Sequence, residues 1–404
     1  MFRTFRYRNL LHSKFWIIIL LTLIWVIADT SFEFMFPTYL ESIGKSYWLI
    51  GLLLSMPAFL GMIFDLPLGN LSDKWSRRKL MAGGLIMLPV FGALIFLFKN
   101  NVVLFIMFAL WGLSYQTWSV PRDAYFASLT SKKKRAEQYG IDGEFSFLGE
   151  AIGPLIGGVL IATFGQFSNL SFYVALCLLA AVLILALVKE KRKKLNVNVV
   201  KTILKSEKSI GHDFGILKNA GAYAVMLLLI SLLFTVFWTT LYTLEPLFYG
   251  SMNLSGAVGG LILSAFSLPA IFLGAPFGRL ADKYGKKSLL FIGMLIMGVS
   301  LIFFADSKAV LFLVIFALIN SVGMILSQPA LSGLIVDLAY KHKKGEMSGI
   351  WYFFSDLGCI VGPLTAGLLA QFWGLSGAFM IIGWIIIIAA LLLIFVRKKP
   401  QTYL

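Results

Sequence analysis

The sequence has few charged residues for its length. Only 13% of its 404 residues are Asp, Glu, Lys or Arg, whereas 59% are hydrophobic. A water-soluble globular chain carries about a quarter charged residues, so this composition excludes an ordinary soluble protein. Long apolar runs predict instead a polytopic α-helical membrane protein.

Cysteine, histidine and phosphate-binding motifs are scarce or missing, which excludes several kinds of chemistry. Cys177 and Cys359 fall inside apolar runs, which argues against a disulfide framework. His12, His212 and His342 fall in hydrophilic segments, so we predict no metal cluster or histidine relay within the membrane. The sequence has no Gly-x-x-x-x-Gly-Lys-Ser/Thr phosphate loop, so ATP hydrolysis is not expected. With no catalytic constellation, we predict that the chain is not an enzyme and uses no cofactor.

Twelve apolar runs are long enough, with their flanks, to cross a hydrocarbon layer of ~30 Å. The first run follows a basic N-terminus, as a signal peptide would. It continues through Asp29 and Glu33 without a small-residue cleavage site, so we expect it to be retained. The predicted spans lie at roughly 14–40, 47–71, 78–98, 102–129, 136–164, 168–190, 219–249, 255–281, 286–305, 309–340, 344–372 and 375–396.

The positive charges alternate along the chain and predict its topology. There are 35 Lys and Arg against 19 Asp and Glu, a formal net charge of +16. All basic residues except Lys45, Lys99, Lys308 and Arg122 lie at the termini or in every second connection. This positive-inside pattern places both termini in the cytoplasm of a plasma or inner membrane. Because the clusters lie beside helix ends and form no single patch, no nucleic-acid partner is expected.

A repeat with a spacing of 209 residues divides the chain into two halves. The segment GNLSDKWSRRK, which begins at Gly69, returns as GRLADKYGKKS from Gly278. In a membrane chain such a repeat predicts a transporter built from two related bundles. The predicted units are an N-terminal six-helix bundle at 1–189, a cytoplasmic basic linker at 190–218 and a C-terminal six-helix bundle at 219–404.

These features resemble the major facilitator superfamily of secondary transporters over essentially the whole chain. The family pattern after the second span is Gly-x-Leu-x-Asp-Arg/Lys-x-Gly-Arg-Arg/Lys. The first copy fits it at Gly69, Asp73, Arg77 and Arg78, with Ser76 replacing the second Gly, and the second copy fits more fully. The resemblance implies an all-α fold of twelve transmembrane helices in two pseudo-symmetric six-helix bundles.

The resemblance also implies that the two loops gate the cytoplasmic side. In the family, the Asp, a following basic residue and an acid on an adjoining helix hold the inward face closed. The second half has the full set in Asp282, Lys286 and Asp337, after Gly278. In the first half the position equivalent to Asp337 is Ser128, which lacks the acid. The alternative is that these residues only fix topology, but topology requires cations and does not explain the Asp.

Two glycine ridges predict close helix packing, because small residues four apart let helices approach. The fifth-span ridge resembles the signature of the superfamily's proton-coupled drug antiporters, which favours export. The eleventh span repeats the ridge, which lowers its value as an antiporter marker, and simple close packing between the spans is the alternative. The residues are Gly149, Gly153, Pro154, Gly157, Gly358, Gly362 and Pro363.

Acids inside the apolar runs are the candidate proton sites, because a charge within a bilayer is costly and faces a cavity or a partner. Asp29 and Glu33 lie one helical turn apart, with Trp25 on the same stripe. Two carboxylates this close disfavour each other's charge, which predicts a proton site near neutral pH. Glu150 is a second candidate for protonation, and Asp65 and Asp356 are further acids within the spans.

Aromatic residues share helix faces with these charges and predict an aromatic substrate cavity. Surplus carboxylates beside aromatic rings suit an amphipathic, cationic substrate through cation–π contact. The candidate cavity residues are Trp25, Asp29, Glu33, Tyr115, Trp118, Arg122, Asp123, Glu150, Tyr242, Glu245 and Gln328, with Trp111 and Trp238 as weaker candidates. For Arg122 the alternative is a structural ion pair with Asp123 or with an acid of the first span.

The sequence therefore predicts a secondary active transporter working by alternating access. The leading hypothesis is proton-coupled efflux of small amphipathic or lipophilic compounds, with Asp29 and Glu33 exchanging protons and Arg122 adjusting their proton affinity. One alternative is proton- or cation-coupled uptake of a polar solute such as a sugar or an organic acid. Another is a lipid flippase or a transporter-like receptor. The expected partners are a small-molecule substrate, protons and membrane lipid, and the chain is expected to be a monomer.

Overall fold

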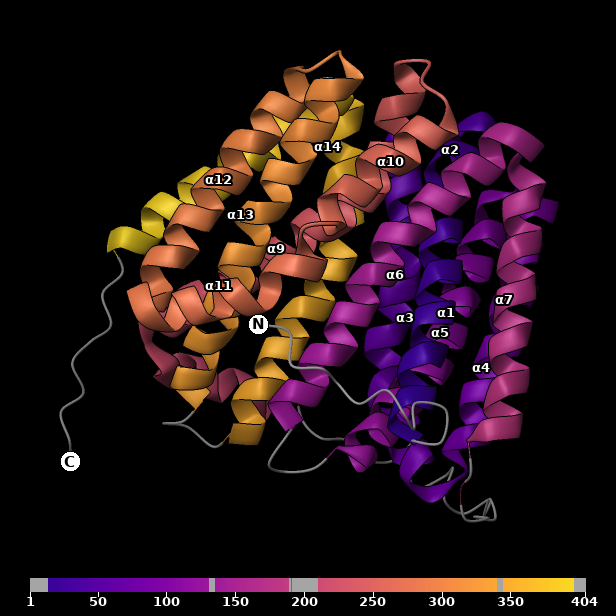
Figure 1. Ribbon diagram of the computed structural model, residues 1–404, viewed down its shortest axis with the longest axis horizontal. Helices are drawn as coiled ribbons and strands as arrows, with labels where there is room; N and C mark the ends of the chain where they lie inside the picture. Colours follow the sequence, from indigo (N-terminus) through magenta and orange to yellow (C-terminus); the bar gives the residue numbers. More distant parts are fainter. Residues whose placement is uncertain (1–13, 131–134, 189, 191–209, 340–343, 396–404) are drawn as a thin grey trace.

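The computed structural model describes residues 14–130, 135–188, 190, 210–339 and 344–395, and within these ranges it contains helices and no strands. Figure 1 shows the helices lying side by side in a bundle. In chain order they are α1 (Lys14–Glu33), α2 (Phe36–Ser42), α3 (Tyr47–Lys74), α4 (Arg77–Leu97), α5 (Asn101–Leu129), α6 (Arg135–Phe164), α7 (Gln166–Leu187), α9 (Ile210–Ser251), α10 (Gly256–Ser267), α11 (Ala270–Tyr284), α12 (Lys286–Asp306), α13 (Val310–Ala339) and α14 (Lys344–Phe395).

The helices cross the membrane twelve times, because the last long helix, α14, is interrupted in its middle. Eleven helical segments among the described residues are long and apolar enough to cross a membrane, and the last is Ile350–Phe395. Gly374 interrupts that segment with φ 71° and ψ 172°, a conformation that glycine adopts without steric cost. The break divides α14 into two crossings, and the predicted all-α fold with twelve transmembrane helices is confirmed.

Three predicted helix boundaries differ from the structure. The first predicted span is divided into α1 and α2 by a turn at Phe34 and Met35. The eighth is divided into α10 and α11 at Pro269, because proline has no N–H to continue the hydrogen-bond ladder. The helix α9 begins at Ile210, inside the predicted linker, and residues 191–209 of that linker lie outside the described residues.

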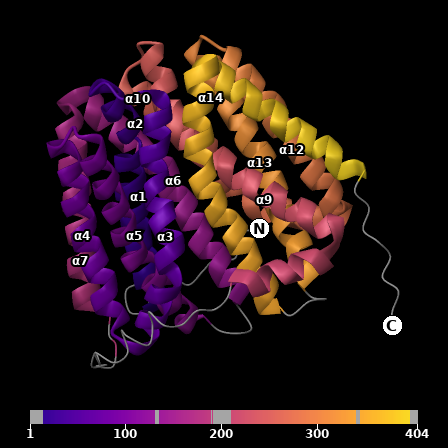
Figure 2. The ribbon, with the colours of Figure 1, turned by 180° about the vertical axis from the view of Figure 1, so that it is seen from behind.

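The two halves of the chain lie on opposite sides of the molecule. Figures 1 and 2 show α1 to α7 grouped on one side and α9 to α14 on the other. The turns that carry the repeated loops, Trp75–Ser76 and Gly285, lie at the same end of the bundle, which we call the basic end. In Figure 1 the two groups approach each other near α2 and α10 and diverge toward the basic end.

The two halves touch through glycines near the end opposite the basic end. Gly51, one turn into α3, packs on the backbone of Pro363 and Gly367 in α14. Gly158 of α6 packs in the same manner on Gly256 and Gly260 of α10. At these positions an added Cβ would collide with backbone atoms of the other half, so only glycine permits this contact.

The predicted glycine ridges pack within each half. Gly149, Gly153 and Gly157 of α6 lie against α1, where Val26, Thr30 and Ser31 are the neighbours. Gly358 and Gly362 of α14 lie against α9, where the neighbours are Leu232, Thr235, Val236 and Thr239. The first ridge therefore packs α6 closely against α1, and the second packs α14 closely against α9.

Replacing Gly51 by alanine should weaken the contact between the halves. The new methyl group would overlap the carbonyl of Pro363, and overpacking of this kind costs about 1–3 kcal/mol. We expect a lower midpoint of thermal unfolding for the purified protein in detergent. Gly140→Ala in α6 is the matched control, because its methyl group would meet no atom within 4 Å and should gain up to about 1 kcal/mol of helix stability. Equal midpoints for the two variants would contradict this account of the interface.

Candidate functional site

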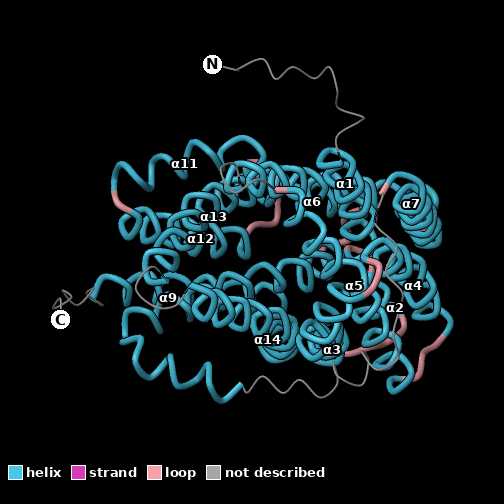
Figure 3. The backbone as a smooth tube through the Cα atoms, turned by 90° about the horizontal axis from the view of Figure 1, so that it is seen from below, coloured by secondary structure: helices cyan, strands magenta, loops and turns pink. Residues whose placement is uncertain are grey.

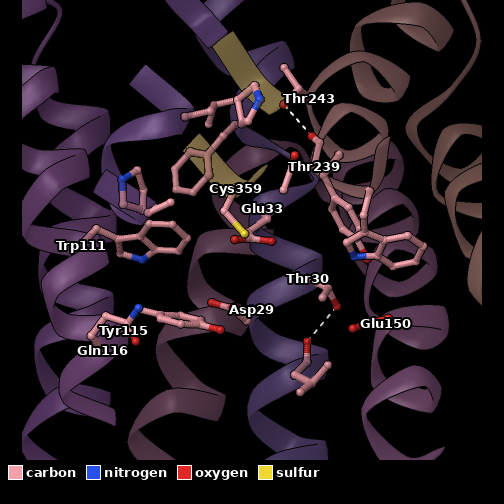
Figure 4. Close-up of a pocket in the computed structure, with 18 of the residues that line it drawn as sticks. Asp29, Thr30, Glu33, Trp111, Tyr115, Gln116, Glu150, Thr239, Thr243 and Cys359 are labelled. Carbon is pink, nitrogen blue, oxygen red and sulfur yellow. Dashed lines mark hydrogen bonds between the residues drawn. The ribbon is translucent and has the colours of Figure 1, made fainter. Parts of the chain in front are cut away.

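A cavity of about 490 Å³ lies between the two halves. Its walls come from α1, α2, α3, α5 and α6 of the first half and from α9 and α14 of the second. This volume lies in the range of sites that enclose small organic ligands. Figure 4 shows side chains from both halves pointing into one space. Aromatic rings form much of the wall: Trp25, Phe36, Trp111, Tyr115, Trp238 and Tyr242.

Among the described residues, four carboxyl groups line this cavity and no Lys, Arg or His does. Asp29 and Glu33 come from α1, Glu150 from α6 and Asp356 from α14. In Figure 4, Asp29 and Glu33 lie one above the other, and Glu150 lies apart from them on another wall. The cavity therefore carries a surplus of acid that nothing on its walls neutralises.

Two of these carboxyl groups have oxygen atoms without hydrogen-bond partners. Asp29 is 5% exposed, and its Oδ1 atom is buried with no partner among the described residues. The Oε2 atom of Glu150 is likewise buried and has no partner there. A carboxylate removed from water is stable only when it is paired or hydrogen-bonded. Each group is therefore suited to hold a proton or to contact a cationic ligand.

Six of the predicted cavity residues line the space. They are Trp25, Asp29, Glu33, Tyr115, Glu150 and Tyr242. Trp111 and Trp238, which the sequence ranked lower because aromatic residues in spans often serve as interface anchors, line it as well. Their neighbours Gln116, Thr239 and Thr243 add neutral hydrogen-bonding groups that sequence periodicity did not distinguish from other polar residues.

The structure places five other predicted residues away from the cavity lining. Trp118 is fully buried and packs on Trp25, with ring centroids 5.7 Å apart. Glu245 is also fully buried, and neither of its carboxyl oxygens has a partner in the part of the chain that the structure describes. Gln328 is exposed on α13. The remaining two, Arg122 and Asp123, belong to a separate ion cluster.

Arg122 forms the centre of an ion cluster that joins α1, α5 and α6; Arg122 and Asp142 are buried, whereas Asp123 is exposed. Its guanidinium group donates to Asp142, to Asp123 at 2.8 Å and to the hydroxyl of Thr22 at 2.9 Å. It also lies 5.1 Å from the ring centroid of Phe126. The pair with Asp123 that the sequence offered as an alternative is therefore present. Asp142 was missed, because nothing in its spacing marks it as the partner of an arginine twenty residues earlier.

The loop at Gly69 is tied to its own half by hydrogen bonds. Arg77 binds Asp73 at 2.8 Å and donates to the carbonyl of Ala124 in α5 at 2.9 Å. At the 209-residue spacing Ala124 is the counterpart of Gly333, and the carbonyl of Gly333 accepts from Lys286 in the same way. The first loop therefore keeps the carbonyl contact but has Ser128 where the second loop has the acid. Ser76, which departs from the family pattern, accepts a hydrogen bond from the backbone N–H of Lys79 and caps α4.

The loop at Gly278 has the ion pair expected of it. Lys286 binds Asp337 with Nζ to Oδ2 at 3.0 Å and donates to the carbonyl of Gly333 at 3.4 Å. This pair joins α12 to α13. Asp282 lies in α11, but its side chain is outside the described part of the structure. Two members of the predicted set are therefore in contact.

Replacing Arg122 alone should lower the stability of the protein more than replacing Arg122 and Asp142 together. Both side chains are almost buried, with 10% and 12% of their surface exposed. Arg122→Met leaves Asp142 without its cation, and an uncompensated buried charge costs about 3–5 kcal/mol. The double variant Arg122→Met/Asp142→Leu removes both charges and should recover most of the lost thermal stability. A double variant as unstable as the single one would contradict the proposed pairing.

Comparisons with known proteins identify the family. A model of the Major Facilitator Superfamily matches residues 15–259 and 226–403. An uncharacterized MFS-type transporter of Methanocaldococcus jannaschii is 23% identical over 356 residues, which cover 84% of this chain and 87% of that protein. The quinolone resistance protein NorA of Staphylococcus aureus is 30% identical over 126 residues, only 31% of this chain and 32% of NorA. A crystal structure of the peptide transporter POT in complex with sulfate has a TM-score of 0.71 at 14% identity, covering 95% of this chain and 94% of that one. The chain belongs to the Major Facilitator Superfamily, a family of membrane transporters and not of enzymes.

Proposed function

We propose that this transporter exports small amphipathic or lipophilic compounds, with a preference for cations, in exchange for protons. The observation that carries the proposal is the cavity between the halves, which combines aromatic walls with four carboxyl groups and no basic side chain. Aromatic faces attract both apolar groups and cations. A cation also compensates the carboxylates, which an uncharged lining cannot do.

Protons are the proposed coupling ions because Asp29 and Glu150 each have a buried carboxyl oxygen without a hydrogen-bond partner among the described residues. Asp29 and Glu33 come from the first half, Asp356 comes from the second, and all three face the same space. A proton and a cationic substrate would compete for the same carboxylates, since either one compensates the buried charge. Competition of this kind couples the outward movement of a cation to the inward movement of protons.

Alternating access is supported by where the halves touch. The glycine contacts of Gly51 and Gly158 lie toward the end opposite the basic end. By the positive-inside pattern the basic end faces the cytoplasm, so this conformation would receive substrate from inside the cell. The loops with Arg77 and Lys286 lie at the basic end and would gate it, each by holding neighbouring helices of its own half together.

The cavity disfavours uptake of an organic acid, the earlier alternative. A carboxylate or phosphate substrate needs a cation or a helix N-terminus to compensate its charge. Four acids and no basic side chain line the cavity within the described ranges. The partial similarity to NorA, a protein named for quinolone resistance, supports the export direction.

Replacing Asp29 should uncouple transport from the proton gradient. In proteoliposomes with an imposed pH gradient, the wild-type protein should move a lipophilic cationic dye against its concentration gradient. Asp29→Asn keeps the size of the side chain but cannot bind a proton, so proton-driven movement should fall to the level of protein-free liposomes. The matched control is Glu144→Gln, which removes an exposed acid of α6 that does not line the cavity.

Two results would count against this proposal. Undiminished proton-driven dye movement by Asp29→Asn would exclude Asp29 as a coupling residue. If the wild-type protein moved neither cationic nor neutral amphipathic dyes, the substrate class would be wrong.

A further inference from the structure

A second hollow lies on the outer surface of the first half, between α3, α4 and α5. Its lining is apolar apart from two hydroxyl groups, and it shares no residue with the central cavity. Figure 3 places α4 on the outer side of the bundle, away from α12 and α13 of the other half. The residues that line this groove are Phe64, Leu68, Leu71, Leu80, Met87, Phe91, Leu110, Leu113, Ser114 and Thr117.

The groove runs inward from the basic end. Leu80 lies one turn after the start of α4 at Arg77, and Phe91 lies deeper in the membrane. At ~1.5 Å of rise per residue, the distance from Leu80 to Phe91 is about 16 Å. That length matches one leaflet, which is half of a hydrocarbon layer of ~30 Å. The groove can therefore accommodate an acyl chain lying along α4.

Two unpaired lysines lie beside the end of the groove. Lys74 ends α3 one turn after Leu71, and Lys79 directly precedes Leu80. Both are exposed, and neither ammonium group has an ion pair or hydrogen bond within the described ranges. Arg77, in contrast, is neutralised by Asp73. The free positive charge is thus located where a lipid headgroup would lie above the groove.

We propose that this groove binds an anionic phospholipid. One acyl chain would occupy the space between Leu80 and Phe91, and the phosphate would pair with Lys74 and Lys79. An apolar groove in a bilayer is filled by lipid tails, and the two cations select among headgroups, since each lysine near the surface attracts anionic lipid by about 1 kcal/mol. The bound chain would contact the outer side of α3 and α5, whose other sides line the central cavity.

The test compares phosphatidylglycerol with phosphatidylcholine of the same acyl chains. Native mass spectrometry of the purified full-length protein in detergent gives the dissociation constant of the first bound lipid. We expect the wild-type protein to prefer phosphatidylglycerol by about thirtyfold, because two lysines at about 1 kcal/mol each contribute about 2 kcal/mol and every 1.4 kcal/mol is a factor of ten. Lys74→Gln/Lys79→Gln should bind the two lipids nearly equally.

A separate variant tests occupation of the groove itself. Thr117 lines the groove, and its hydroxyl group donates to the carbonyl of Leu113 in its own helix. Thr117→Phe should therefore fill the space and weaken binding of both lipids together. Val299→Phe on α12 is the matched control, since that side chain is 44% exposed and belongs to the other half, where Figure 3 shows α12 lying away from α4. It should leave both dissociation constants unchanged.

Three outcomes would overturn the proposal. The first is equal binding of the two lipids by the wild-type protein. The second is the same loss of preference in Lys99→Gln/Lys308→Gln, which removes two charges at the opposite end and would indicate nonspecific attraction. The third is unchanged binding by Thr117→Phe, which would show that the acyl chain does not occupy the groove and that the lipid binds through its headgroup alone.

Discussion

A carboxyl group removed from water and from every cation must hold a proton or attract a positive ligand, and the cavity between the halves is organised by this constraint. Asp29, Glu33 and Glu150 reach it from the first half and Asp356 from the second. Arg122, the one basic residue that the sequence places inside a span, is already occupied by Asp142 and Asp123. Arg122 therefore does not compensate the charge of the cavity acids. A transporter can compensate that charge alternately with a proton and with a cationic substrate.

Close glycine packing makes this cavity possible. The ridge on α6 holds α1 tightly enough that Asp29, Glu33 and Glu150 share one space, and Gly358 and Gly362 do the same for α14 and α9. Between the halves, Gly51 and Gly158 bring backbones together near one end only. Because this contact involves only a few residues at one end, the halves can separate there and close at the basic end instead, as alternating access requires.

The sequence predicted most of the fold because its strongest signals are physical requirements of a membrane. Apolar length, charge alternation and the 209-residue repeat identified the twelve crossings. Helical periodicity placed Asp29, Glu33 and Trp25 on one face, and all three line the cavity. Periodicity could not show that Glu245 is buried outside the cavity lining or that Arg122 pairs with Asp142, because helix rotation and long-range partners are set by tertiary packing. The sequence did not predict the lipid groove either, since its residues come from three helices and form no sequence motif.

The central claim is that a proton and a cationic substrate compensate the same carboxyl groups. Proton release on binding tests it most directly. A lipophilic cation such as tetraphenylphosphonium would be added to the purified protein in weakly buffered detergent near neutral pH, with an indicator dye following the pH. The account predicts proton release that saturates together with binding and is absent with an uncharged analogue. Saturable binding of the cation without any proton release would contradict it.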